Sequence, residues 1–443
     1  MEHEVITRVV LLGGGYVTVW AYRSLVKTLG KQIGSGQVLI TVVCPNECHA
    51  FHGWTAESLT DIIQEQNRMS PLSEILLKAH IIKGKAVKII AANNTVFIRN
   101  SNGSSQLIQY DHLLLGMGSF DNEGVEGLKE YGYQVKSDEA FNRTKQTIKL
   151  LVKQAAVVPP HIAKKLLTFT IAGGGFTGVE LATNIAEYIN ILKNQHPSLQ
   201  KINPVIHLIN RGPTILNVLQ PKFQRIIRYT EKVMQQYNIE VINNNEITKV
   251  TDEGAFLCDR FIQSSMVIST IGQSRMELIG TEKMERDNLK RTYTNAYLQI
   301  KNHSNIWGGG DCSHVTHYKT GEACPANALW AIKHGEFAGR NIGLFIKNQP
   351  LKVFNYEGLG QCASLGIGKG IGELYGLQFT GWTAWIMRWF FFNYFMPSRN
   401  VMFNAVGDWM FLLFRRKRKG LYTEKNKINS KYLQTVGSLH QPV

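Results

Sequence analysis

The sequence predicts an α/β protein made of two similar strand–turn–helix domains, and three stretches support this prediction. Residues 8–28, 166–192 and 305–345 each combine a short apolar strand, a cluster of glycines and a segment with helical spacing of apolar residues. Short continuous apolar runs are typical of parallel strands that are buried on both faces. Alternation of such strands with helices favours a parallel sheet covered by helices.

The central motif is Ile171-Ala-Gly-Gly-Gly-Phe-Thr-Gly-Val-Glu180, which leads into a predicted helix over 179–192. Gly173, Gly175 and Gly178 have the spacing G-x-G-x-x-G. The first glycine permits a tight turn, the second lets a pyrophosphate approach the backbone, and the third lets helix and strand pack closely. The helix N-terminus adds unpaired N–H groups. The motif therefore predicts a Rossmann-like domain that binds a dinucleotide, and a glycine turn without a ligand is the alternative.

A second copy of this pattern lies near the N-terminus. Gly13, Gly14 and Gly15 follow an apolar strand and precede a segment with helical spacing. Thr18 occupies the position of the third glycine, so we expect slightly looser packing between helix and strand there. This copy predicts a second dinucleotide-binding domain.

The strand that follows, 37–43, lacks the acidic residue that usually binds the adenosine ribose at its end. Cys44 stands there, and Glu47 is the nearest carboxylate that could reach the ribose. Cys44 and Cys48 also raise the possibility of a redox dithiol. Because they end a strand rather than begin a helix, packing cysteines are the favoured interpretation.

The strand 204–209 of the central domain ends in Asn210-Arg211. An acid at this place favours the free 2′-hydroxyl of NADH, whereas a neutral residue followed by arginine suits the 2′-phosphate of NADPH. Asn210 and Arg211 therefore favour NADPH. Arg211 as an ordinary solvated side chain is the alternative.

Two further strands end in glycine and belong with the first motif. The stretch 110–119 ends in Gly116-Met-Gly118, which could bring backbone close to a cofactor. The stretch 305–312 ends in Gly310-Asp311, and such a carboxylate can lie beside the ribityl chain or pyrophosphate of a flavin. A helix that opens near Ala328 follows and could face the carbonyl end of the flavin.

Bulk composition restricts the partners. The formal net charge of +16 indicates an anionic partner, such as a membrane surface, a charged cofactor or nucleic acid. No nucleic-acid module accompanies the charge, so nucleic acid is not expected. The six cysteines form no C-x-x-C pair and the histidines lack metal-ligand spacing, so we expect no metal and a reducing compartment. No signal or transit peptide is visible, which favours a cytoplasmic location.

The segment Leu377–Phe414 is rich in aromatic residues and is followed by the basic run 415–419. Trp382, Trp385 and Trp389 recur at helical spacing, and polar residues interrupt every apolar run before it reaches the length of a membrane span. An amphipathic segment beside a basic cluster predicts binding to an anionic membrane surface through 382–419. A buried helix or a homodimer face is the alternative.

Two dinucleotide motifs about 160 residues apart, followed by Gly310-Asp311, form a specific combination. In these features the chain resembles the two-domain flavoproteins, and most of all the type II NADH:quinone oxidoreductases, which do not pump protons. The resemblance also rests on 110–119 and on 354–372. It implies FAD at the first motif, NADH or NADPH at the second, and a membrane quinone as electron acceptor. It places Glu180 near the junction of nicotinamide and flavin, as the candidate catalytic residue, and Asp311 at the flavin.

The chain departs from that family where the resemblance implies a quinone site. The family pattern Ala-Gln-x-Ala-x-Gln-x-Gly becomes 328–335 here, with Leu329 and Lys333 in place of the two glutamines and Ala331 between them. Leu329 cannot donate a hydrogen bond to a quinone carbonyl, whereas Lys333 can. An NADPH-dependent reductase with another hydrophobic acceptor is therefore an alternative. A flavin-bound redox sensor or interaction protein at the membrane is another. A disulfide reductase or sulfide:quinone oxidoreductase is disfavoured, because no cysteine lies between 48 and 258.

These observations predict five regions. Residues 1–120 and 296–376 form a split FAD domain, and 121–295 form the NAD(P) domain inserted between its parts. Residues 377–419 form a region that associates with the membrane, and 420–443 form a polar tail.

Overall fold

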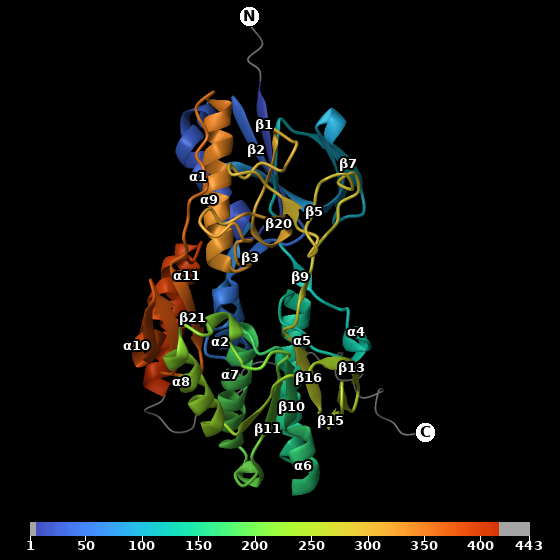
Figure 1. The fold of residues 1–443 in the computed structure, drawn as a ribbon, viewed down its shortest axis with the longest axis vertical. Helices are drawn as coiled ribbons and strands as arrows, with labels where there is room; N and C mark the ends of the chain where they lie inside the picture. The colour runs from blue at the N-terminus through green and yellow to red at the C-terminus, as the bar shows by residue number, and fades with distance from the viewer. Residues whose placement is uncertain (1–5, 416–443) are drawn as a thin grey trace, which may run out of the picture.

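Two sheets lie end to end along the long axis of the molecule, and a C-terminal module flanks them (Figure 1). The computed structural model describes residues 6–415. The expected polar tail and most of the basic run 415–419 lie outside the described residues.

The first sheet has seven strands in the order β19-β8-β1-β2-β5-β6-β7. Neighbours from β19 to β5 pair in parallel, and β5, β6 and β7 pair antiparallel. The strands are β1 (Thr7–Leu12), β2 (Val38–Cys44), β5 (Ala79–Ile90), β6 (Thr95–Asn100), β7 (Ser105–Gln109), β8 (His112–Leu115) and β19 (Ile306–Gly308). This sheet contains strands from both ends of the chain, so the first domain is split in sequence.

Two long helices, α1 (Tyr16–Gly34) and α9 (Ala328–Ile346), lie against each other beside this sheet (Figure 1). Their backbones approach closely because α9 has glycines at the contact. A β-carbon at Gly335 would lie 2.4 Å from the Val17 carbonyl oxygen, and one at Gly339 would lie 2.2 Å from that of Ala21. This packing fixes the start of α9 relative to the glycine turn before α1.

The second sheet is parallel, with the order β12-β11-β10-β16. The strands are β10 (Thr168–Ala172), β11 (Val205–Ile209), β12 (Ile239–Ile242) and β16 (Met266–Ser269), and the helices of this domain are α4 (Leu128–Tyr131), α5 (Asp138–Ala155), α6 (Pro160–Leu166), α7 (Phe176–Lys193) and α8 (Gln224–Gln236). A small antiparallel sheet, β13 (Ile247–Thr251), β14 (Gly254–Leu257) and β15 (Phe261–Gln263), completes it. Together with the first sheet, this confirms the predicted α/β fold with two Rossmann-like domains.

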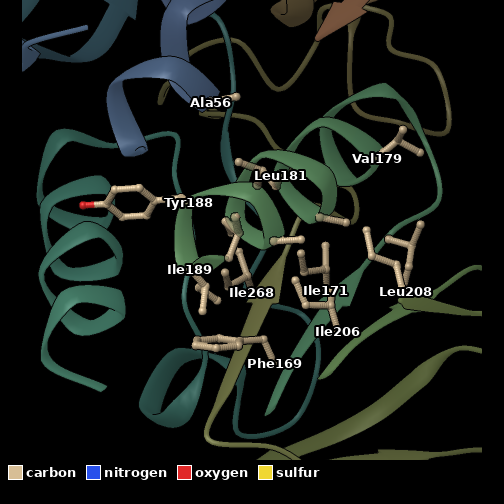
Figure 2. Packing of buried hydrophobic residues seen from close by; sticks show 14 of the residues in the cluster. Ala56, Phe169, Ile171, Val179, Leu181, Tyr188, Ile189, Ile206, Leu208 and Ile268 are labelled. Atoms are coloured by element: carbon tan, nitrogen blue, oxygen red, sulfur yellow. The ribbon is translucent and has the colours of Figure 1, made fainter. Parts of the chain in front are cut away.

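Figure 2 shows how α7 covers the second sheet. Val179 on the helix lies over Ile171, Ile206 and Leu208 of the strands, all fully or almost fully buried. Ala56 reaches the same cluster from α2 (Thr55–Leu59), which belongs to the first part of the chain. The two domains therefore share an apolar contact, and this contact places α2 beside α7.

The chain passes between the domains at two strands that pair with each other, β9 (Phe120–Asp121) and β17 (Gln273–Ser274). Met276, Leu278 and Met284 already pack in a cluster of the first domain. The packing therefore favours a return to the first domain near residue 275, rather than near the predicted boundary at 295.

The C-terminal module is a three-stranded antiparallel sheet with two helices. It consists of β21 (Gly360–Ser364), β22 (Gly370–Leu374), β23 (Leu377–Gly381), α10 (Trp382–Tyr394) and α11 (Arg399–Arg415). Ala363 and Ile371 of this sheet, and Leu365 between them, join the core of the second domain, whereas Trp385 and Trp409 of the helices join that of the first. The module thus contacts both domains (Figure 1).

The remaining short elements are β3 (Cys48–Ala50), β4 (Met69–Pro71), α3 (Leu72–Ile75), β18 (Thr292–Tyr293) and β20 (Ser313–His314).

Candidate active site

Both glycine motifs form tight turns between a strand and a helix. Gly13 and Gly173 have φ of 99° and 113°, a backbone region that residues with a β-carbon rarely adopt. A β-carbon at Gly178 would lie 1.8 Å from the Gly173 carbonyl oxygen, so only glycine fits there. In contrast, Gly175 at the start of α7 has no neighbouring atom within 4 Å of that position. The turn is therefore closed on the protein side and open on the side where a phosphate would bind.

Thr18 fits the first domain because the residue that faces it, Gly116, has no side chain. A β-carbon at Gly116 would lie 2.7 Å from the Thr18 hydroxyl, which donates to the Leu12 carbonyl at 3.4 Å. Thr270 takes the place of Gly116 in the second domain. Its backbone N–H donates to the Ala172 carbonyl at the end of β10, as the Gly116 N–H donates to the Leu12 carbonyl at the end of β1. Its hydroxyl donates to the Ala172 carbonyl, and it faces Gly178. The first domain thus has threonine on the helix and glycine after the neighbouring strand, and the second domain has the opposite arrangement. The looser packing expected at Thr18 is absent, because Thr18 is fully buried.

Asp311 lies in a polar cluster beside the first turn. It accepts a hydrogen bond of 2.6 Å from the Ser119 hydroxyl, and the Lys136 ammonium lies 3.5 Å away. Gly118, one residue before Ser119, has φ of 67° and open space at its β-carbon position. Lys136 comes from the second domain and was not predicted from the sequence.

The buried basic side chain of Arg68 fits an anionic group near this turn. Arg68 is 1% exposed, and its Nε and Nη2 atoms have no hydrogen-bond acceptor among residues 6–415. Its closest carboxylate, that of Asp138, lies 3.6 Å away. Burial, and to a smaller extent the charge of Arg68, lower the pKa of the neighbouring His52 to about 3. A pyrophosphate or another anionic part of a flavin nucleotide would supply the missing acceptors.

Gly14 and Gly15 complete the predicted flavin turn, whereas Glu47, the predicted ribose contact, already has another partner. A β-carbon at Gly14 would lie 2.6 Å from the Cys44 sulfur, so this thiol fills space against the turn. Burial raises the pKa of Cys44, which fits a packing role. Glu47 is exposed and forms an ion pair of 2.5 Å with Lys83. Its carboxylate is available to a ribose only if that pair rearranges.

A mostly apolar cavity of about 210 Å³ lies between the first domain and the C-terminal module. Ala328 and Leu329 line it, whereas Ala331 and Lys333 are not among its lining residues. Lys333 instead forms an ion pair of 2.7 Å with Glu336, and Ala331 is buried. The structure therefore brings only the first part of the predicted quinone pattern to the cavity. Five phenylalanines contribute to the wall; they come from α7, from α10 and from the segments that follow β3 and α10: Phe51, Phe176, Phe391, Phe392 and Phe395.

The polar groups at this cavity were mostly missed by sequence reasoning. Tyr16, Gln361 and Arg388 line it together with Cys362. The Gln361 side chain makes no hydrogen bond with any residue that the structure describes. Burial raises the pKa of the Cys362 thiol to about 12, so it is protonated at neutral pH and unsuited to thiolate chemistry.

Arg388 links two carboxylates at the inner end of the cavity. Its Nη1 donates to Glu57 through a short contact, and its Nη2 lies 3.1 Å from Glu180 and donates to the Gly53 carbonyl at 2.8 Å. Glu57 is fully buried and Arg388 is 2% exposed. Glu180 also accepts a hydrogen bond of 2.7 Å from the Ser364 N–H. The group therefore joins α2, α7 and α10, one element from each part of the fold.

This arrangement controls the protonation of Glu180. Burial raises its pKa to about 7; Arg388 opposes this shift and Glu57 adds to it. Two carboxylates share one guanidinium, so the group carries a surplus negative charge when both are ionised. Glu180 thus exchanges a proton near neutral pH, which is a property of catalytic acids and bases.

The three tryptophans that recur at helical spacing on α10 differ in exposure: Trp382 is exposed, Trp389 is half-buried and Trp385 is buried. Trp385 is 7% exposed and packs against Trp409, at 4.8 Å between ring centroids. Exposed large apolar residues recur every four positions on α10: Trp382, Ile386, Phe390 and Tyr394. Three more lie on α11: Phe403, Met410 and Phe411. Phe391 and Phe395, which line the cavity, each follow an exposed member of this face. Within residues 6–415, no helix is both long and apolar enough to cross a membrane.

Asn210 and Arg211 lie at the end of β11, beside the second glycine turn. No cluster of three potential metal-ligating side chains occurs in the part of the chain that the structure describes. The predicted residues of both motifs are therefore in place, while those of the quinone pattern are only partly so.

Comparisons with known proteins agree with this geometry. Residues 7–335 match the pyridine nucleotide-disulphide oxidoreductase family. A type II NADH:quinone oxidoreductase of Staphylococcus saprophyticus is 24% identical over 391 residues, covering 86% of this chain and 93% of the relative. The demethylphylloquinone reductase NdbB of Synechocystis is 24% identical over 420 residues, covering 91% and 97%. The structure of NDH2 from Plasmodium falciparum in complex with NADH superposes with a TM-score of 0.81 at 14% identity, covering 91% and 97%.

Proposed function

Because this chain belongs to the pyridine nucleotide-disulphide oxidoreductase family, we propose that it is an FAD-dependent oxidoreductase that passes electrons from NADH or NADPH to a membrane quinone. The names of its quinone-reducing relatives from Staphylococcus and Synechocystis support the acceptor. The observation that carries the proposal is the apolar cavity with Arg388 on its wall and Glu180 behind it.

The glycine turns and their partners would hold the two nucleotides. Gly13, Gly14, Gly15 and Gly118 would lie against FAD, with Asp311 at its polar part. Gly173, Gly175 and Gly178 would lie against the nicotinamide nucleotide. FAD, when bound, supplies two-electron chemistry: it accepts a hydride from the nicotinamide and reduces the quinone.

The protein's own contribution is orientation, water exclusion and proton supply. Reduction of a quinone by NADH or NADPH consumes one proton in addition to the hydride. Glu180 holds a proton near pH 7 and contacts Arg388, which lines the cavity. The aromatic wall excludes water, which strengthens the electrostatic effect of Arg388 on bound acceptor. Glu180 is therefore assigned as the catalytic proton-holding residue.

The acceptor would enter from a membrane surface. The exposed face of α10 lies beside the cavity-lining face of the same helix. A peripheral location on the cytoplasmic side, through α10, α11 and the basic run 415–419, would place the cavity at the lipid boundary. Each basic residue near an anionic surface would add about 1 kcal/mol of attraction. The same exposed face would serve a homodimer if no membrane binding occurs.

Leu329 favours a second candidate, a reductase for another hydrophobic acceptor. Leu329 lines the cavity but cannot donate a hydrogen bond, so a quinone carbonyl would depend on Gln361 or Arg388. An acceptor with fewer carbonyl groups would not need that donor.

The test is a two-step anaerobic experiment on purified protein in mild detergent. Addition of NADPH or NADH should bleach the flavin absorption band, and a short-chain quinone should then restore it. Leu329→Trp, which fills the cavity, should slow recovery and leave bleaching unchanged, while Leu107→Trp on the exposed β7 serves as the control. Bleaching without recovery by any quinone would favour the second candidate. Absence of a flavin band would refute both.

A further inference from the structure

The end of β11 is built around a neutral side chain. Asn210 follows Ile209, whose carbonyl accepts a hydrogen bond from the Gly173 N–H, so this residue adjoins the second glycine turn. A β-carbon at Gly174 would lie 2.4 Å from the Asn210 Oδ1 atom. In a Rossmann-like domain, the residue at this place meets the 2′-position of the adenosine ribose.

The hydrogen bonds of Asn210 require an amide. Its Nδ2 donates to the Gly212 carbonyl at 2.9 Å and to the Asn243 Oδ1 at 2.8 Å. An aspartate would present an oxygen to both acceptors and would lose both bonds. The surrounding structure therefore disfavours the carboxylate that binds a free 2′-hydroxyl and repels a 2′-phosphate.

The loop beyond Asn210 offers a free cation and a hydroxyl. Arg211 is exposed and has no ion pair with any described side chain. The Thr214 Oγ1 is buried and without a hydrogen-bond partner among residues 6–415. The backbone N–H groups of Asn244 and Asn245 donate to the carbonyls of Gly212 and Asn210, so a neutral segment faces this loop, and Asn245 donates to the Asp259 carboxylate at 2.8 Å.

We propose that the second domain selects NADPH over NADH, with the 2′-phosphate bound by Arg211 and Thr214 beside Asn210. The inference rests on the proposed function, since it names the electron donor of the same site. An arginine–phosphate contact is charge-assisted and can be bidentate, whereas NADH leaves this cation without a partner. Loss of such a contact corresponds to about a 10- to 100-fold loss in affinity.

Two measurements test the proposal on the full-length flavoprotein. Anaerobic stopped-flow spectroscopy gives the rate of flavin reduction at a series of NADPH and NADH concentrations. We expect kcat/KM to be at least about tenfold higher for NADPH. Arg211→Gln should remove most of this preference by weakening NADPH alone, and Arg211→Asp should reverse it. Arg225→Gln, an exposed arginine on α8 of the same domain, is the matched control and should change nothing.

The second measurement does not depend on turnover. Titration calorimetry compares 2′,5′-ADP with 5′-AMP, which lacks the 2′-phosphate, in wild type and Arg211→Gln. Tighter binding of 2′,5′-ADP, weakened selectively in Arg211→Gln, supports the proposal even if the protein does not reduce quinone. Equal or stronger binding of 5′-AMP, or a preference for NADH, overturns it. Failure of both nucleotides to reduce flavin would refute the proposed function, and calorimetry would still decide the phosphate site.

Discussion

Removing one member of the Arg388 group should move the pKa of Glu180 in a direction that depends on the member removed. Arg388→Gln takes away the cation that lowers this pKa, so it should rise above about 7. Glu57→Gln takes away the carboxylate that raises it, so it should fall. A general loss of structure would move the pKa of Glu180 in the same direction in both variants, so opposite shifts would exclude that explanation.

The magnitude follows from the 3.1 Å separation of Glu180 and Arg388. With an effective dielectric constant of about 20, one pair of unit charges at this distance interacts by roughly 5 kcal/mol. Solvent and relaxation reduce the net effect, so we expect a rise of at least about one pH unit in Arg388→Gln. The same substitution leaves Glu57 buried without its cation, which should cost about 3–5 kcal/mol of folding free energy. Arg388→Lys retains the charge and is the matched control.

The assay is an infrared titration of the carboxyl band between pH 5 and 9, with Glu180→Gln used to identify the band of Glu180. Flavin absorbance and melting temperature confirm that each variant is folded and loaded. Stopped-flow measurement of quinone-dependent flavin reoxidation then shows whether the kinetic midpoint follows the infrared midpoint. An unchanged band position in both Arg388→Gln and Glu57→Gln would refute the electrostatic account of this site.

Three other changes have defined outcomes. Glu180 binds its proton more strongly in the folded state, so stability should fall as pH rises from about 4.5 to about 7, and Glu180→Gln should flatten this part of a melting-temperature profile. Gly178→Ala places a β-carbon 1.8 Å from a carbonyl oxygen and should abolish nucleotide binding in calorimetry, whereas Gly175→Ala, which meets open space, should retain the fold. Phe390→Ser should reduce sedimentation with anionic vesicles severalfold and leave soluble turnover unchanged; equal sedimentation would exclude α10 as the membrane-binding face.

The glycine turns could be predicted because their requirements are local. A positive φ at Gly173 and close contact at Gly178 follow from residues within one turn of chain, and the structure has both. The pairing of Thr18 with Gly116 could not be predicted, since the two residues are about 100 positions apart and either alone looks like a weakened motif.

The site at the cavity was predicted less completely, because its residues come from distant elements. Arg388 had one available signal: it is an isolated cation within a strongly aromatic stretch, and such residues are usually paired when buried. Glu57 gave no comparable signal. The buried face of α10 could not be predicted, because this helix is apolar on most sides and spacing alone does not identify the side that packs inward.

The exchange of threonine and glycine between the two domains restricts which pairs of substitutions each domain tolerates. A β-carbon at residue 116 would lie 2.7 Å from the Thr18 hydroxyl, so a side chain at 116 conflicts with threonine at 18. In the second domain, a β-carbon at residue 178 would lie 3.1 Å from the Thr270 hydroxyl and also 1.8 Å from the Gly173 carbonyl oxygen. Truncating Thr270 would therefore not make room for a side chain at 178, whereas Gly116 does make room for threonine at 18.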